Sequence, residues 1–167
     1  MSRFAKARGS AFESLVEQHW FAYASQKVCK VEKVDPPTRI CWKGRQAIPI
    51  QLENPFLDYV GTWTERAGRM LMVEAKTTLA PRLPFDVKTG GLKIEQCENM
   101  KRWQASGAAV AILWQHRDEI RLVLPVHIEE AEWQQRRSIK WEEAYQVPRG
   151  RGFLIFDWMK KLREIYP

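Results

Sequence analysis

Three charged side chains, Asp58, Glu74 and Lys76, fall in two short segments whose patterns are typical of neighbouring β-strands. Side chains alternate between the faces of a strand, so Glu74 and Lys76 share one face of the segment 70–76 (MLMVEAK). Buried charges are costly unless they are paired or bind an ion. The pair at the end of an apolar strand therefore indicates either a chemical site or a solvent-facing ion pair on an edge strand.

A predicted β-hairpin brings Asp58 close to this pair. The segments 57–64 (LDYVGTWT) and 70–76 are joined by a polar turn that contains Gly68. With the turn centred near residues 66 and 67, Asp58 lies opposite Ala75, give or take a residue, and beside Glu74. Two adjacent carboxylates repel each other unless a cation lies between them.

Carboxylate oxygens at this spacing suit a hard cation such as Mg²⁺ or Mn²⁺. Such an ion holds phosphate oxygens and lowers the pKa of its bound water. Lys76 would place a positive charge near the attacking water or the scissile phosphate, either as a proton-transfer group with a lowered pKa or as a purely electrostatic group. The spacing therefore predicts metal-dependent phosphodiester hydrolysis, with the surface ion pair as its alternative.

The composition predicts one globular domain with a polyanionic partner. The chain has 167 residues, 45% of them hydrophobic, and a net charge of +7. This charge favours nucleic acid, although many proteins are basic without such a partner. No P-loop, GxSxG or HExxH motif is present, so NTP hydrolysis and serine-esterase or zinc-protease chemistry lack support.

The cysteines and the apolar segments bear on the compartment. Cys29, Cys41 and Cys97 have no zinc-site spacing and are expected to be reduced thiols. The chain has no secretory signal pattern, and no apolar run approaches the roughly 20 residues of a membrane span. We therefore expect a cytoplasmic protein without a membrane partner.

The hydrophobic periodicity predicts helices over 10–26, 94–106, 126–135 and 155–165, and strands over 27–34, 57–64, 70–76, 108–114 and 119–124. The continuous apolar run 108–114 indicates a buried central strand with helices on both faces, in an α/β or α+β single-sheet domain. Segments 79–93 and 136–153 are expected to be irregular. Ser10 and Glu13 form a capping-box pattern, so Glu13 is either a cap partner or a group that points into the site.

Several further side chains have both a functional and a structural interpretation. Residues 38–56 predict a projecting arm or a long loop, in which Trp42 either stacks on an unpaired base or packs at a dimer interface. The basic N-terminal residues either grip phosphates or form a solvated tail, and the basic stretch 136–151 either extends a DNA surface or is a solvated loop. His19 is expected to be packed in the core. Trp20, Trp103, Trp114 and Trp133 are also expected there.

Taken in order, these motifs resemble the PD-(D/E)XK nuclease core and, more narrowly, the RecU-type Holliday-junction resolvases. The resemblance covers most of residues 8–125. It rests on Arg8-Gly9 with Phe12-Glu13, Val34-Asp35-Pro36-Pro37, Leu57-Asp58-Tyr59-Val60-Gly61, Val73-Glu74-Ala75-Lys76-Thr77-Thr78 and Glu95-Gln96-Cys97-Glu98-Asn99-Met100. This sequence departs from the family pattern at Phe56-Leu57, where a threonine or proline is usual, and at Glu95, where the family has a histidine. The tryptophan-rich C-terminal part has no match.

The resemblance implies an α/β, restriction-endonuclease-like fold, with a central mixed sheet flanked by helices and a stalk-like arm at about 36–56. It implies a single nuclease domain over 1–167 that acts as a homodimer, with Mg²⁺ or Mn²⁺, on branched DNA. Asp58 and Glu74 would be metal ligands, Lys76 the catalytic lysine, Glu13 an accessory acid and Gln96 a group that orients substrate or water.

The implied function is a Holliday-junction resolvase that nicks opposing strands of four-way junctions during recombination. The alternatives are an inactive DNA-binding accessory protein of recombination and a general nuclease on linear DNA. The expected DNA-binding residues are Arg3, Lys6, Arg8, Arg39, Lys43 and Arg45.

Overall fold

The computed structural model describes residues 3–51, 56–85 and 91–167, without the side chains of residues 3–6 and 51. A six-stranded mixed sheet with the order β1-β4-β5-β7-β8-β10 forms its centre. Its strands are β1 (Lys30–Lys33), β4 (Tyr59–Trp63), β5 (Arg69–Thr78), β7 (Ala109–His116), β8 (Glu119–Val123) and β10 (Tyr145–Gln146). The pair β5–β7 is parallel, and the other neighbours are antiparallel.

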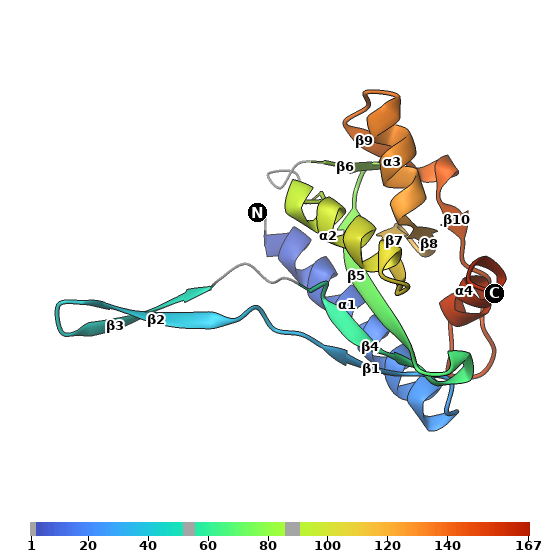
Figure 1. Cartoon of the computed structure of the whole chain (residues 1–167), viewed down its shortest axis with the longest axis horizontal. Helices are drawn as coiled ribbons and strands as arrows, with labels where there is room; N and C mark the ends of the chain where they lie inside the picture. The colour runs from blue at the N-terminus through green and yellow to red at the C-terminus, as the bar shows by residue number, and fades with distance from the viewer. Residues whose placement is uncertain (1–2, 52–55, 86–90) are drawn as a thin grey trace.

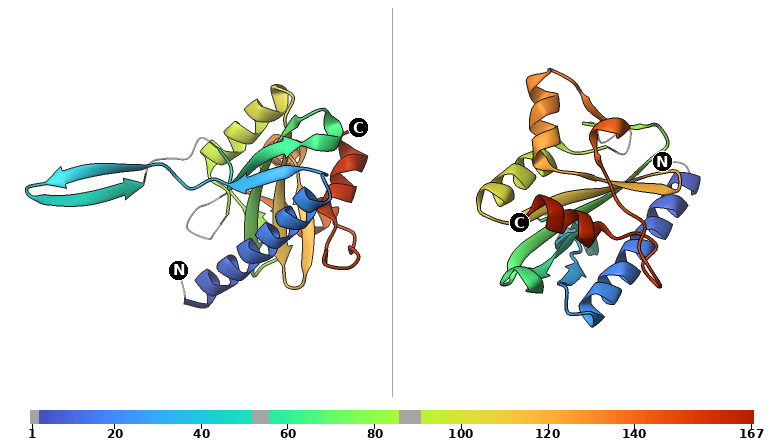
Figure 2. Two further views of the ribbon diagram at one scale, coloured as in Figure 1. Left: turned by 90° about the horizontal axis from the view of Figure 1, so that it is seen from below. Right: turned by 90° about the vertical axis from the view of Figure 1, so that its right-hand side faces the viewer.

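Helices cover both faces of this sheet (Figures 1 and 2). They are α1 (Arg3–Ser25), α2 (Ile94–Ala105), α3 (Pro125–Trp133) and α4 (Trp158–Ile165). Apolar residues of α1 and α4 pack with Val73 and Ala111 on one face, and those of α2 and α3 pack with Met72 and Ile112 on the other. Successive side chains of β5 and β7 point to opposite faces of the sheet, so each strand contributes residues to two separate hydrophobic cores. The prediction of a central mixed sheet flanked by helices is confirmed.

The predicted arm is a two-stranded hairpin that projects far from the body (Figure 1). It consists of β2 (Thr38–Lys43) and β3 (Gln46–Gln51). Residues directly opposite in an antiparallel pair share a face, and Ile40 lies opposite Pro49 while Trp42 lies opposite Ala47. One face of the arm is therefore apolar, and Ile40 and Trp42 are 62% and 71% exposed.

Glycine allows the close approach of the strand that leads into the arm. A Cβ atom at Gly61 of β4 would lie 2.0 Å from the carbonyl oxygen of Lys30 in β1. Only glycine leaves room for the backbone there. Gly61 is thus part of what holds the edge strand β1 against the hairpin.

Four sequence-based expectations are wrong. The first helix begins at Arg3, so the basic N-terminal residues are helical, and Ser10 lies inside the helix with its carbonyl accepting a hydrogen bond from Ser14 Oγ (3.0 Å). The predicted capping box therefore does not exist.

Segments 79–93 and 136–153, which were expected to be irregular, contain short elements of regular structure. These are β6 (Arg82–Pro84), β9 (Ser138–Lys140), β10 and the 3₁₀ helix η3 (Trp141–Glu143). Trp133 is 83% exposed, because it lies off the stripe formed by the buried Ile128 and Ala131.

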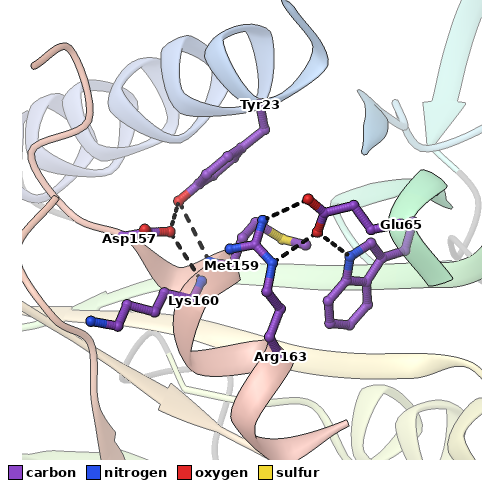
Figure 3. Close-up of polar contacts among 7 residues, drawn as sticks. Tyr23, Glu65, Asp157, Met159, Lys160 and Arg163 are labelled. Atoms are coloured by element: carbon purple, nitrogen blue, oxygen red, sulfur yellow. Dashed lines mark hydrogen bonds and ion pairs between the residues drawn. The ribbon is translucent and has the colours of Figure 1, made fainter. Parts of the chain in front are cut away.

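A set of polar contacts, which we call the C-terminal clamp, fastens α4 to distant parts of the chain (Figure 3). The hydroxyl of Tyr23 donates to Asp157 Oδ1 (2.9 Å). Arg163 donates twice to Glu65 in the 3₁₀ helix η1 (Thr64–Arg66), at 2.8 and 3.1 Å. His19 of α1 belongs to the clamp as well, because its Nε2 accepts the backbone N–H of Phe156 (3.3 Å).

All three cysteines are free, in line with the expectation of reduced thiols. Cys29 and Cys97 are buried, whereas Cys41 on the arm is only half-buried. Burial raises the pKa of both Cys29 and Cys97 to about 12. Within the described ranges, no helix is long and apolar enough to cross a membrane.

Candidate active site

The hairpin β4–β5 brings Asp58 and Glu74 together as the sequence predicts. Tyr59 is paired with Val73, so Asp58, the residue before β4, lies beside Glu74. The backbone N–H of Asp58 donates to Glu74 Oε2 (3.2 Å), and the backbone N–H of Ala75 donates to Asp58 Oδ2 (3.1 Å). The backbone at Asp58 thus holds the side chain of Glu74, and the backbone at Ala75 holds the side chain of Asp58. These reciprocal contacts keep the two carboxylates next to each other.

Glu74 is the centre of the cluster and is 1% exposed. Its Oε1 accepts hydrogen bonds from two side chains, Lys76 Nζ (2.5 Å) and Gln96 Nε2 (2.6 Å). Lys76 lies two residues along β5 on the same face, as strand alternation requires. A buried carboxylate with this many donors is firmly oriented.

The two acids outnumber the single lysine, and Asp58 shows the consequence. Burial and the charge of Glu74 raise the pKa of Asp58 to about 7, although Lys76 and the N–H of Ala75 act in the opposite direction. The repulsion from Glu74 and the burial therefore both favour the protonated form of this carboxyl group. A positive charge placed between the acids would relieve the repulsion that holds this proton.

Lys76 remains an ammonium ion in this setting. Burial acts to lower its pKa, but the charge of Glu74 and the hydrogen bond to it outweigh burial, so the pKa is raised. Its side chain is 20% exposed. Of the two roles expected for Lys76, this environment favours the electrostatic one over proton transfer.

Glu13 lies at the edge of the cluster rather than in it. Its carboxylate pairs with Lys33 at the end of β1 (2.8 Å), and Lys33 also contacts Glu17 (3.2 Å). Glu13 is close enough for its charge to raise the pKa of Asp58 slightly. The structure therefore does not bring Glu13 into contact with the two acids that the resemblance groups with it.

Gln96 reaches the cluster from the first turn of α2. Its Oε1 accepts the backbone N–H of Lys93 (3.1 Å), and its Nε2 donates to Glu74. The amide is therefore held at both ends, and the group it orients is the carboxylate of Glu74. This is a more definite role than the orientation of substrate or water that the resemblance implies.

The donor set of the cluster matches a hard divalent cation. Asp58 and Glu74 offer carboxylate oxygens, and Mg²⁺ is commonly bound by one or two carboxylates while water and substrate phosphates complete its shell. Among the residues that the structure describes, no group of three or more acidic, histidine or cysteine side chains could hold a metal ion. Two carboxylates would leave the other positions around such an ion to water and phosphate oxygens.

The predicted DNA-binding residues lie outside this cluster. Arg39, Lys43 and Arg45 are exposed on the arm. Arg8 is exposed on α1, whereas the side chains of Arg3 and Lys6 lie outside the described part of the chain. The structure thus separates two groups of residues, the acidic cluster in the body and the basic residues of the projecting arm.

Sequence reasoning missed two features of the site. The backbone N–H of Ala75 donates a hydrogen bond to Asp58. Every residue except proline has such a donor, so the residue type at position 75 does not predict this contact. Lys33, on the strand predicted over 27–34, binds two acids of α1, and the sequence does not predict this contact. That contact depends on the pairing of Lys33 with Tyr59 across β1–β4, which only the folded chain reveals.

The chain was compared with known proteins. No family model matches it, and no curated protein does. Solved structures similar to it include an Archaeoglobus fulgidus protein, Hjc, which is a Holliday junction resolvase from an archaeal hyperthermophile. That match has a TM-score of 0.48 and 14% identity, and it covers 83% of this chain and 95% of the other.

Proposed function

We propose that this chain is a metal-dependent endonuclease that nicks four-way DNA junctions as a homodimer. The observation that carries the proposal is the convergence of Asp58, Glu74, Lys76 and Gln96 from three segments through polar contacts of 2.5 to 3.2 Å. A buried acid and a second, half-buried acid beside one amine are costly for a fold to keep unless they serve a ligand.

Asp58 and Glu74 would hold the metal in this proposal, and Gln96 keeps Glu74 in position. A bound Mg²⁺ or Mn²⁺ would supply a water of lowered pKa and positive charge on the scissile phosphate. Lys76, which is already protonated, adds its charge beside the same phosphate and stabilises the negative charge that develops on it. Its partial exposure leaves the ammonium group accessible to a ligand from solvent.

The arm supports branched DNA as the substrate. An isolated two-stranded hairpin is marginally stable in water, and this one exposes Ile40 and Trp42 on the same face. Arg39 and Lys43 lie on the opposite face of β2. We infer that the arm enters the open centre of a junction, with cations on the phosphates and Trp42 against unpaired bases. A homodimer would then present two sites to opposing strands.

The decisive experiment is cleavage of a labelled four-way junction, and of linear duplex of equal length, with and without Mg²⁺. We expect Mg²⁺-dependent nicks in the junction only. Glu74→Ala should abolish cleavage and leave junction binding nearly intact. Glu98→Ala is the matched control, because Glu98 is an acid on α2 whose partner is Lys101, and this variant should cut like the wild type.

Other outcomes would redirect the proposal. Equal cleavage of linear duplex would indicate a general nuclease. Tight junction binding without cleavage in either Mg²⁺ or Mn²⁺ would indicate a DNA-binding accessory protein. Cleavage that survives in Glu74→Ala would place the chemistry elsewhere in the chain.

A further inference from the structure

A second basic surface lies on the two-stranded ribbon formed by β6 and β9. Arg82 is paired directly with Lys140, and Leu83 with Ile139. Leu83 and Ile139 are both completely buried, which anchors one face of the ribbon in the core. Arg82 and Lys140 therefore share the outer face, where both are exposed.

This arrangement places like charges directly opposite each other, which destabilises an antiparallel pair. In the described part of the chain, no acidic side chain forms an ion pair with Arg82 or Lys140. The adjacent acid, Glu143, is bound to Arg136 (2.8 Å) and to the backbone N–H of Lys140 (3.0 Å). The charge of Lys140 also acts on Glu143 and helps to lower its pKa. Both cationic side chains nevertheless face solvent on the exposed face of the ribbon, where they suit an external anion.

The ribbon is attached to the candidate active site. Arg82 follows Lys76 by six residues, so their Cα atoms are at most about 22 Å apart. The carbonyl of Pro84 in β6 accepts the backbone N–H of Leu92 (2.8 Å), just before the helix that carries Gln96. Figure 1 shows the ribbon beyond the end of β5 and near α2, on a different side of the body from the arm.

We propose that Arg82 and Lys140 bind backbone phosphates of the duplex that flanks the cleaved position, on the side away from the arm. The inference rests on the proposed function, because it takes DNA as the substrate. Fixed cations on a strand pair contact phosphates without reading sequence, so this surface would add affinity and orientation rather than sequence preference. The arm would hold the junction centre while the ribbon holds one duplex arm.

The test is the salt dependence of junction binding in EDTA, where no cleavage occurs. Each lost phosphate contact lowers the slope of log K against log salt by about 0.9, so R82Q/K140Q should lower it by about 2 and weaken binding roughly tenfold or more at 0.1 M salt. K27Q/K160Q removes the same number of charges from exposed positions after α1 and in α4. This control should bind like the wild type.

Hydroxyl-radical footprinting locates the contact. Protection lost in R82Q/K140Q should be confined to about six base pairs from the nicked phosphate, given the reach from Lys76. The variant K140E separates binding from folding, because it creates an opposite-charge pair with Arg82. Its unfolding midpoint should not fall, and its DNA affinity should fall further than that of K140Q.

The outcomes distinguish this inference from the proposed function. If the wild type cuts junctions while R82Q/K140Q and K140E keep its affinity and salt slope, the ribbon proposal is overturned and the nuclease stands. If the chain never cuts DNA but the ribbon variants lose affinity and slope as expected, the ribbon contact holds without the nuclease.

Discussion

The candidate active site and the C-terminal clamp both join distant segments through carboxylates, but their charges balance differently. In the clamp, Glu65 faces Arg163 in a two-contact pair, and the hydrogen bond from Arg163 lowers the pKa of Glu65. In the site, two acids share one lysine, and the pKa of Asp58 is raised to about 7. Paired charge at the surface stabilises the fold, whereas excess charge in the interior costs stability, and our proposal assigns that cost to ligand binding.

The largest expected effect comes from removing the excess charge. Asp58→Asn keeps an oxygen for the N–H of Ala75 but ends the repulsion with Glu74. We expect cleavage to fall at least a thousandfold, as for the loss of a central catalytic group, while the metal-free protein at pH 8 unfolds at an equal or higher urea concentration. If Asp58→Asn had a lower urea midpoint and still cleaved DNA, Asp58 would serve the stability of the fold rather than the chemistry.

The next effect tests whether orientation of Glu74 matters as much as its charge. Gln96→Ala removes the amide that donates to Glu74 Oε1. Loss of such a supporting group typically costs 10- to 100-fold, and we expect that loss in Mg²⁺ affinity or cleavage rate. The exposed neighbour Glu95 provides the control, and Glu95→Ala should retain full activity. If Gln96→Ala cleaved DNA at the wild-type rate, the role of Gln96 would be limited to accepting the N–H of Lys93 at the start of α2.

A smaller effect concerns the pH dependence of the clamp. Burial lowers the pKa of His19 below 6.5. As the pH falls, His19 therefore becomes protonated in the unfolded chain at a higher pH than in the folded chain. The contribution of His19 to stability is therefore fully present above pH 6.5 and is lost below it, by at most about 1.4 kcal/mol per pH unit.

Urea unfolding of the wild type and of His19→Gln at pH 7.5 and 5.5 measures this contribution as the difference between the two proteins. The remaining pH dependence belongs to other groups, because burial also lowers the pKa of His127 and raises that of Asp58, which acts in the opposite direction. Relative to His19→Gln, the wild type should lose more stability, or gain less, on going to pH 5.5. An unchanged pH dependence in His19→Gln would mean that His19 tolerates its proton in the folded state.

The smallest effect is expected at the exposed pair of the clamp. Glu65→Gln breaks a contact whose partners are 40% and 35% exposed, so solvent screens it and the loss in unfolding free energy should be about 0.5 kcal/mol. Because the folded pKa is lowered, this contribution is present above pH 4.5 and disappears as the pH falls through the folded value. Cleavage should not change, and a loss of activity would show that the clamp and the site are coupled.

The sequence predicted the elements that depend on neighbouring residues. Local periodicity and turn residues predict the hairpin that carries Asp58 and Glu74, the helix α2 and the strand pair β7–β8. Gly107, which was predicted to end the helix that is now α2, follows it with a φ of +94°. Strands β6 and β9 were missed because each has three residues and its partner lies more than fifty positions away. No local pattern reports such a pairing.

The candidate site was predictable in part for the same reason. Strand alternation and one turn are enough to place Asp58, Glu74 and Lys76 together. Gln96 and Glu13 were suggested only by the family resemblance, and their contacts depend on how α2 and α1 pack on the sheet. The Ser10–Glu13 pattern was misleading because the helix continues through Gly9 to Arg3.

The unequal burial of the three cysteines makes the arm chemically addressable. At neutral pH, Cys29 and Cys97 are inaccessible and almost wholly in the thiol form, whereas Cys41 is partly open to solvent midway along β2. A maleimide dye should therefore couple to the arm of the unmutated protein in preference to the body. Energy transfer from that dye to a junction labelled at its crossover would test whether the hairpin enters the junction, as we propose.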